Sequence, residues 1–395
     1  MTFTHIEESI EMDVADDISS ILRDAANTYI AGRYDPANLQ KDSLKPRLVD
    51  RRLWREMAEM GWLGICLPES VGGSELGLDG AVVLSEVFGR TLFPVPFAAA
   101  VCMPSELIRV ALNDGVSDAA AATEFSQWII AGERLLTLAW QERPGQMSVE
   151  PAATVLKDGK VSGRKFFVPA VEDDSVLLVQ VIADGEPAVV AVAVDAPGVS
   201  YELFASGLGS YATVTFDAAP VLHERPLLQG QSAEVALRRA LAAGRIVLSA
   251  QLAGLASGCL EKTIKYVGER VQFNRPIGSF QTIQHRCVDL HIDTLLAAAS
   301  WRNAVDCWPQ DESIDISNAS DVAISAAKAR CGDAAMKVTK QAVQMHGAMG
   351  FAEEVDVGFY LRAAMQSASI LGDAHAHRRH FAQASAALAA GVAHV

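Results

Sequence analysis

The fold is decided by the stretch Tyr266-Val-Gly-Glu-Arg-Val-Gln-Phe-Asn-Arg-Pro-Ile-Gly-Ser-Phe-Gln281. Pro276 is expected to end the helix that precedes it, and Ser279 to cap the helix that follows. Arg270 then falls in the last helical turns, where a cation offsets the negative end of the helix dipole. Alternatively, a guanidinium fixed there holds a pyrophosphate through two parallel hydrogen bonds, and the Gln281 amide adds a further contact.

A second informative segment is Gln344-Met-His-Gly-Ala-Met-Gly-Phe351, at the end of a long helical pattern. Gly347 and Gly350 are typical of a glycine that ends a helix. The other interpretation is that small residues let the backbone approach a dinucleotide and point free N–H groups at it.

Hydrophobic spacing divides the chain into three zones, which predicts an α+β multidomain fold. Residues 1–130 show helical periodicity, interrupted by a tight loop at Pro68 to Gly73. Residues 131–230 contain short β-branched runs closed by turn residues, which predict a small β-barrel or sandwich. Residues 231–395 predict an antiparallel four-helix bundle. Its helices are expected at Ala233 to Arg270, Gln281 to Trp308, Ile316 to His346 and Val357 to Ala390.

The charge pattern excludes some partners and locations. The net charge is −15 and no run of Lys or Arg is present, so nucleic acid is not an expected partner. Charges interrupt every apolar stretch, which predicts no membrane span, and the acidic residues 1–17 do not resemble a secretory signal. The six cysteines are scattered and predict buried free thiols. We expect a cytoplasmic protein.

Both segments resemble motifs of the acyl-CoA dehydrogenases. Arg270, Phe273, Ile277 and Gln281 resemble that family's Arg-x-x-Phe-x-x-x-Ile-x-x-x-Gln, and Gln344, Gly347 and Gly350 resemble its Gln-x-x-Gly-Gly-x-Gly. The family's amino-terminal helical domain is matched by Trp54, Gly61, Trp62, Pro68, Glu69, Gly72, Gly73, Glu86, Gly89 and Arg90. The resemblance implies FAD as cofactor, an acyl-CoA thioester as substrate and an electron-transfer acceptor. It also implies a dimer of dimers, in which the first motif contacts the FAD of the neighbouring subunit.

In the middle zone, Leu138 to Glu142 and Gly163 to Val168 resemble the family's two flavin-covering segments, while its Gly-Ser-Asp element is absent from Gly145 to Ala152. The resemblance assigns the flavin wall to Leu138, Trp140, Gln141, Phe167 and Val168. Trp140 and Phe167 are equally compatible with the core of a barrel.

The α-proton of an acyl-CoA must be removed by a base while a hydride leaves to the flavin. The two positions where the family carries its catalytic Glu hold Leu371 and Gly244 here, next to the retained Arg245, which is predicted to contact the substrate. Both base positions are therefore empty.

Three explanations compete for this gap. The favoured one is that the chain is the base-deficient subunit of a heteromer, completed by a paralogue that carries Glu. The second is a carboxylate from elsewhere, with Asp373, Glu353 and Glu354 as candidates. The third is other chemistry on the same scaffold, such as a flavin-dependent oxygenase. A non-catalytic subunit that completes a partner's FAD site is a further alternative.

Three histidines, His375, His377 and His380, lie close together in the last predicted helix. The first two are two residues apart and so point to different faces of a helix, which argues against a metal site. They are interpreted as cations near a helix C-terminus.

Overall fold

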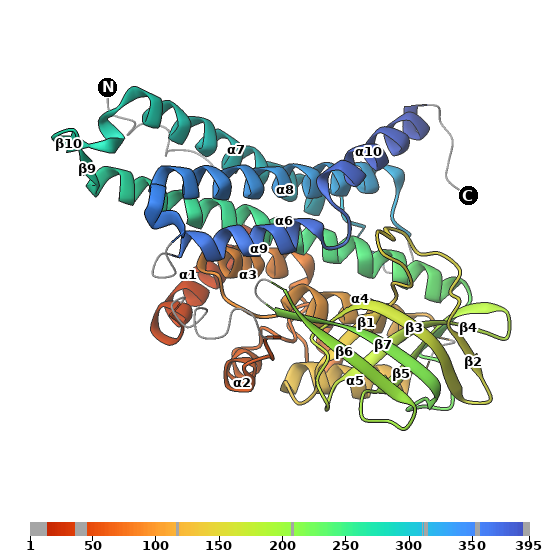
Figure 1. Ribbon diagram of the computed structural model, residues 1–395. Coiled ribbons are helices and arrows are strands. Elements are labelled where there is room, and N and C mark those ends of the chain that lie inside the picture. The colour runs from red at the N-terminus through yellow and green to blue at the C-terminus, as the bar shows by residue number, and fades with distance from the viewer. Residues whose placement is uncertain are drawn as a thin grey trace.

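The computed structural model describes residues 14–35, 46–115, 118–206, 209–309, 311, 315–351 and 356–389. Long helices run side by side across the molecule, the amino-terminal helices lie beneath them, and a β-sheet packs at one end (Figure 1). The candidate bases Glu353 and Glu354 lie outside the described residues.

The amino-terminal region is helical, as predicted. Its elements are α1 (Val14–Arg33), α2 (Arg51–Glu59), the short η2 (Glu69–Val71), α3 (Gly77–Thr91), the π-helical turn η3 (Ala98–Cys102), α4 (Met103–Asn113) and α5 (Ala119–Ala131). The tight loop after Pro68 is confirmed, because Gly72 has φ +88° and a Cβ on Gly73 would lie 2.1 Å from the Leu67 carbonyl oxygen. Only glycines fit both positions.

The middle region forms one sheet. Its strands are β1 (Leu136–Ala139), β2 (Val155–Lys157), β3 (Lys160–Pro169), β4 (Val176–Ala183), β5 (Glu186–Ala193), β6 (Val199–Ser206), β7 (Gly209–Pro220) and β8 (Leu228–Gln229). The order is β6-β7-β3-β2-β4-β5-β8, with β1 parallel to β4. The predicted barrel is not confirmed among the described residues, because the edge strands β6 and β8 pair with β7 and β5 but not with each other, so the sheet stays open.

The carboxy-terminal region is a helical bundle whose last predicted helix is broken. Its elements are α6 (Gln231–Glu269), β9 (Val271–Gln272), β10 (Arg275–Pro276), η4 (Ile277–Ser279), α7 (Gln281–Asp306), α8 (Asn318–His346), η5 (Gly347–Phe351), α9 (Val357–Ser369) and α10 (Ala374–Ala389). Between α9 and α10, Leu371 has φ +56° and Gly372 has φ +104°. Asp373 Oδ1 then accepts from the Ala376 amide at 2.7 Å and caps α10. We call residues 370–373 the Leu371 corner.

The details predicted around Arg270 are also corrected. The helix α6 ends at Glu269, so Arg270 is an extended residue after the helix. Pro276 lies in the β9–β10 hairpin, whose turn residues Phe273 and Asn274 have φ of +52° and +62°. Ser279 donates to the Pro276 carbonyl and does not cap α7, because the hairpin separates the two helices.

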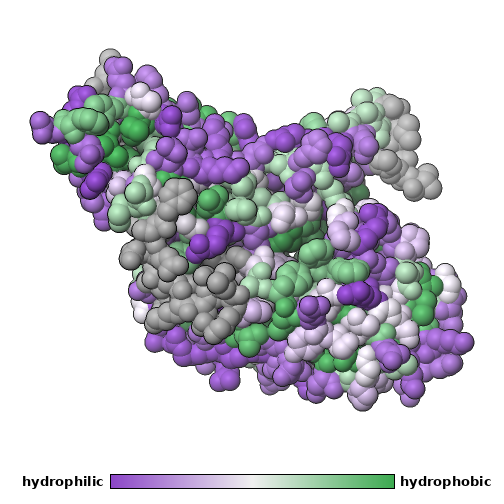
Figure 2. Space-filling model, in the orientation of Figure 1, coloured by the Kyte–Doolittle hydropathy of each residue, from purple (hydrophilic) through white to green (hydrophobic). Residues whose placement is uncertain are grey.

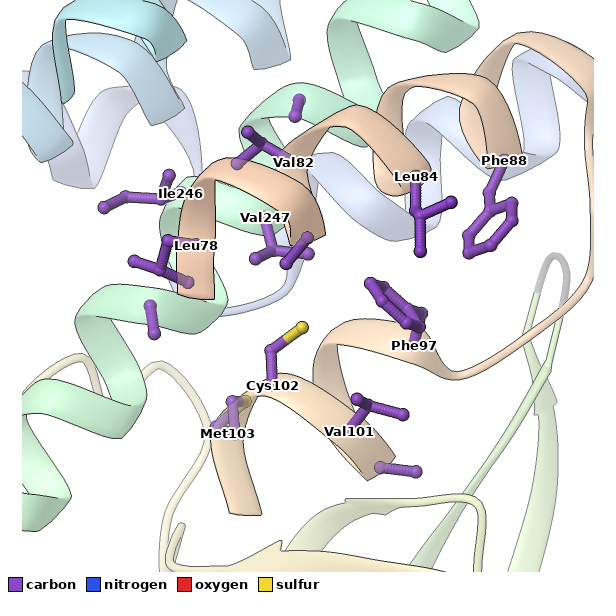
Figure 3. Close-up of a cluster of buried hydrophobic side chains, with 14 of the residues drawn as sticks. Leu78, Val82, Leu84, Phe88, Phe97, Val101, Cys102, Met103, Ile246 and Val247 are labelled. Atoms are coloured by element: carbon purple, nitrogen blue, oxygen red, sulfur yellow. The ribbon is translucent and has the colours of Figure 1, made fainter. Parts of the chain in front are cut away.

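Helices α3 and α6 touch through their backbones. A Cβ on Gly254 would lie 1.9 Å from the Glu86 carbonyl oxygen, and one on Gly89 would lie 2.0 Å from that of Gln251. Around this contact, apolar side chains of α3, of η3 with α4, and of α6 meet in one cluster (Figure 3). In the described part of the chain only α6 is long and apolar enough to span a membrane, and 83% of its most apolar window is buried. It is therefore the central helix of the bundle.

Candidate functional site

A cavity of about 620 Å³ lies between the sheet and the helices. The residues after β1, the β3–β7 face of the sheet, η3, α6 and the Leu371 corner all contribute to its wall. The side chains used below are Trp140, Gln141, Phe167, Leu248, Gln251 and Leu371. A volume of this size is that of a small-molecule or cofactor site.

A β-bulge directs Phe167 into this cavity. The pairing of β3 with β7 shifts register between Lys165 and Val168, and Phe167 has φ +53°. Its ring is 43% exposed and meets the ring of Phe204 edge to face at 5.8 Å. Val168, predicted beside it in the flavin wall, is instead buried in the sheet core. The bulge thus presents one aromatic ring to the cavity, which regular alternation would not do.

The Gln141 side of the wall is held by a buried ion pair. Gln141 accepts a hydrogen bond from the Phe166 amide at 2.8 Å through its carbonyl oxygen. The neighbouring Glu142 carboxylate accepts from Lys165 Nζ at 2.7 Å and from Thr154 Oγ1 at 2.6 Å. Burial raises the pKa of Glu142, but these donors outweigh it and lower the pKa to about 2. Burial lowers the pKa of Lys165 to about 8, although Glu142 opposes the shift.

The two predicted base positions face each other. A Cβ added to Gly244 would lie 2.8 Å from Leu371 Cδ1 and 2.8 Å from Met103 Sδ. The Leu371 side chain therefore fills the space above Gly244. Among the cavity-lining residues that the structure describes, Asp373 alone has a carboxylate, and this group is exposed and caps α10. The wall at this point is apolar.

Three buried side chains, those of Arg245, Lys328 and His377, donate hydrogen bonds to carbonyl oxygens of the Leu371 corner. Arg245 donates to the carbonyl oxygens of Met147 and, at 3.4 Å, Leu371. Lys328 Nζ donates to the Ala368 and Gly372 carbonyls at 3.0 and 2.9 Å. Burial lowers the pKa of Lys328 to about 7. Arg245 thus lies behind the wall, and the structure gives it a supporting position where the sequence predicted contact with substrate.

The histidines are not at a helix C-terminus, which corrects that interpretation. His375, His377 and His380 lie in the first half of α10. His377 is buried, and burial lowers its pKa to about 3, so the neutral ring donates from Nε2 to the Leu371 carbonyl at 3.0 Å. His380 pairs with Asp321. Within the described residues no group of three potential ligands is arranged to hold a metal.

The remaining predicted residues gather at the other end of the bundle, around the β9–β10 hairpin (Figure 1). Tyr266 near the end of α6 stacks on His346 at the end of α8, with ring centroids 4.1 Å apart, which brings the two motifs together. The first motif contributes Arg270, Phe273 and Gln281, and the second contributes Gln344, Gly347 and Gly350. Phe273 is 87% exposed. Figure 2 shows apolar surface gathered at this end of the molecule.

Comparisons with known proteins agree along the chain. The family model for the acyl-CoA dehydrogenase N-terminal domain matches residues 17–118, and that for the C-terminal domain matches residues 233–386. Acyl-CoA dehydrogenase FadE27 of Mycobacterium tuberculosis is 30% identical over 353 residues, which cover 84% of this chain and 87% of the relative. The chain belongs to the acyl-CoA dehydrogenase family.

Other family members support this placement. Benzylmalonyl-CoA dehydrogenase of Aromatoleum aromaticum is 28% identical over 334 residues, covering 80% of this chain and 84% of its own. A variant of the Tcur3481–Tcur3483 steroid ACAD has a TM-score of 0.81 at 28% identity and covers 95% of this chain and 99% of its own. The ChsE4–ChsE5 complex of Mycobacterium tuberculosis has a TM-score of 0.81 at 26% identity, with coverage of 96% and 99%. Each of these two solved structures pairs two differently named chains.

The family consists of flavoprotein oxidoreductases, and the cavity of this member fits a flavin. Trp140 and Phe167 present aromatic surfaces beside the amide of Gln141. The amide nitrogen donates to the Arg143 carbonyl at 3.0 Å, which leaves its second N–H and its oxygen for a ligand. A planar, largely apolar ring with polar edges needs such a wall.

Sequence reasoning missed one part of the wall. Leu248 and Gln251 line the cavity on the same face of α6 as Gly244. Their spacing of four and seven residues from Gly244 places them on one side of a helix. The sequence signal for these two residues was their helical spacing from Gly244, a position that was already assigned to the site.

Proposed function

We propose that this chain is the base-deficient subunit of a heteromeric, FAD-dependent acyl-CoA dehydrogenase. One observation carries the proposal: Leu371 packs over Gly244, so an apolar contact fills the place where a catalytic Glu would stand. Neither residue can accept a proton. The base for α,β-dehydrogenation of an acyl-CoA thioester would then come from a paralogous partner chain, in the cytoplasm.

The residues of this chain would bind and orient the flavin and the acyl group. Trp140, Gln141 and Phe167 would hold the flavin, which accepts a hydride when bound and passes its electrons to an electron-transfer acceptor. Leu371 and Leu248 would exclude water from the acyl group. Exclusion of water strengthens every remaining electrostatic contact in the cavity.

The exposed end of the bundle would complete the cofactor site of a neighbouring subunit. Arg270 and Gln281, with the glycine segment Gln344 to Gly350, would meet the diphosphate and adenosine of its FAD. Two observations support this part. Phe273 projects into solvent from a backbone with positive φ, which is costly for an aromatic residue unless something contacts it. Along α7, Val288, Ile292 and Leu295 form an exposed apolar face at helical spacing, as in a dimer of dimers.

The proposal is tested by producing the chain alone and together with a paralogue that carries Glu. We expect that the chain alone does not reduce an electron acceptor with any acyl-CoA, and that the complex does. Turnover by a yellow preparation of the chain alone would refute the heteromer. Consumption of O₂ with reduced flavin and no response to acyl-CoA would indicate an oxygenase instead.

Asp373→Asn separates the heteromer from a self-sufficient enzyme. Asn retains the helix cap, so the fold is kept, while the carboxylate is lost. We expect unchanged turnover in the complex. A loss of about 10²- to 10⁴-fold, the contribution of a positioned base, would make Asp373 the base and refute the proposal.

A further inference from the structure

The cavity extends along α6 away from the Leu371 corner. Gly244, Leu248 and Gln251 follow one another on the same face of this helix, and the last two line the cavity. At 1.5 Å per residue, Gln251 lies about 10 Å further along the helix than Gly244. An acyl group whose α-carbon sits at the base position therefore reaches Gln251 only if it is long.

This distant part of the wall is mainly apolar but contains an amide without a partner. Phe97 and Leu248 contribute its apolar surface. The Gln251 side chain is partly buried and, within the described residues, makes no hydrogen bond. A ligand oxygen that enters the cavity would be able to accept a hydrogen bond from this amide.

The wall of the cavity also includes a cation. Arg47 lines the cavity and acts electrostatically on Tyr34, whose hydroxyl donates to the Leu92 carbonyl oxygen just after α3. Gly89, near the end of α3, packs on the backbone of Gln251. The amide and the guanidinium line the same cavity. Both donate N–H groups, and a guanidinium has no acceptor, so the group that suits both is an acceptor oxygen.

We infer that the acyl group of the substrate carries a ketone or carboxylate oxygen about 10 Å from its α-carbon, bound by Gln251 with Arg47 beside it. The inference rests on the proposed function, since it assumes that an acyl-CoA enters this cavity. Extended covalent chains advance roughly 1.2 Å per bond, so the oxygen lies about eight bonds from the α-carbon. Short acyl groups, and long ones without oxygen, leave the amide unpaired.

Three CoA thioesters of nearly equal length test the inference: decanoyl-CoA, 9-oxodecanoyl-CoA and decanedioyl-CoA. Their dissociation constants are measured by titration calorimetry on the purified flavin-containing complex and on the same complex with Gln251→Leu. Gln383→Leu, the same exchange on the exposed side of α10, is the matched control.

We expect at least one oxygen-bearing thioester to bind about tenfold more tightly than decanoyl-CoA, and Gln251→Leu to abolish the preference without weakening decanoyl-CoA. If decanedioyl-CoA binds best and Arg47→Met removes that advantage, the oxygen is a carboxylate. If decanedioyl-CoA and 9-oxodecanoyl-CoA bind equally, the oxygen that Gln251 binds is a neutral carbonyl. Equal binding of all three, or a preference that survives Gln251→Leu, overturns the inference but leaves the proposed function standing. Absence of binding by all three overturns both.

Discussion

Replacing Glu142 with Gln tests whether its ion pair with Lys165 supports the cavity wall. The Glu142 carboxylate accepts from Lys165, from Thr154 and, at 2.6 Å, from the Ala153 amide. Gln keeps the shape but carries no charge and turns an NH₂ group toward these donors. Lys165, whose side chain is 0% exposed, would lose its counter-ion.

The loss of stability expected for Glu142→Gln is the sum of the costs at the groups that donate to Glu142. Lys165 already has its pKa lowered to about 8, so releasing its proton at pH 7 costs about one pKa unit, or about 1.4 kcal/mol. The weakened bonds from Ala153 and Thr154 cost about 1 kcal/mol each. The total of about 3 kcal/mol is at the lower end of the range for a broken buried pair. At about 2.1 cal/mol/K per residue over 395 residues, Tm falls by about 4 °C.

Differential scanning calorimetry measures this shift, with Glu150→Gln as the matched control. Glu150 pairs with Arg143 at 2.6 Å, but the two side chains are 40% and 58% exposed, so less than about 1 kcal/mol is expected. Equal shifts in the two variants would refute the reasoning.

The pH dependence of the Glu142→Gln effect gives a second check. The pKa of Glu142 is about 2 in the fold, below its ordinary value of 4.5. A lowered carboxyl pKa stabilises the fold above the unfolded value, and this contribution disappears as pH falls through the folded value. The difference between wild type and Glu142→Gln should therefore narrow between about pH 4.5 and 2. A constant difference would contradict the assignment.

Three further predictions concern stability and assembly. Gly254→Ala places a Cβ 1.9 Å from the Glu86 carbonyl and should lower Tm, whereas Gly268→Ala, with nothing within 4 Å, should leave it unchanged or slightly higher. The pKa of Lys328 is lowered from 10.5 to about 7 in the fold, so between these values the unfolded chain binds more protons and stability rises with pH. Urea unfolding at about pH 6.5 and about pH 9 measures this rise. The rise should be smaller in Lys328→Met than in wild type. Ile292→Lys on the exposed face of α7 should reduce the mass of the assembly measured by light scattering, and an unchanged mass would exclude that face from the interface.

Most of the fold could be predicted because its signals are local. The apolar periodicity of α6 placed it at Ala233 to Arg270, and the structure has Gln231–Glu269. That the sheet stays open could not be predicted, since whether the edge strands β6 and β8 pair with each other is a long-range property that alternation within each strand does not encode. The break at the Leu371 corner did leave signals, Gly372 and the capping Asp373, but the surrounding helical pattern concealed them.

The candidate site was predicted less completely. The family resemblance assigned Gln141 and Phe167 to one wall, and both line the cavity; the motifs of Arg270 and Gly347 meet because α6 and α8 end together. Val168 was misplaced because the bulge at Phe167 shifts the alternation by one residue. The role of Arg245 was inferred from the family resemblance, yet its side chain donates to the carbonyls of Leu371 and Met147. Direction of a side chain depends on packing, which spacing alone does not give.

The glycine contact between α3 and α6 limits how the enzyme can change its substrate range. Because backbone touches backbone there, the two helices cannot slide or separate without breaking the core. Between these two helices, the width of the cavity is therefore fixed by the main chain. New selectivity would have to arise by exchanging side chains such as Leu248 and Gln251, and not by opening a hinge.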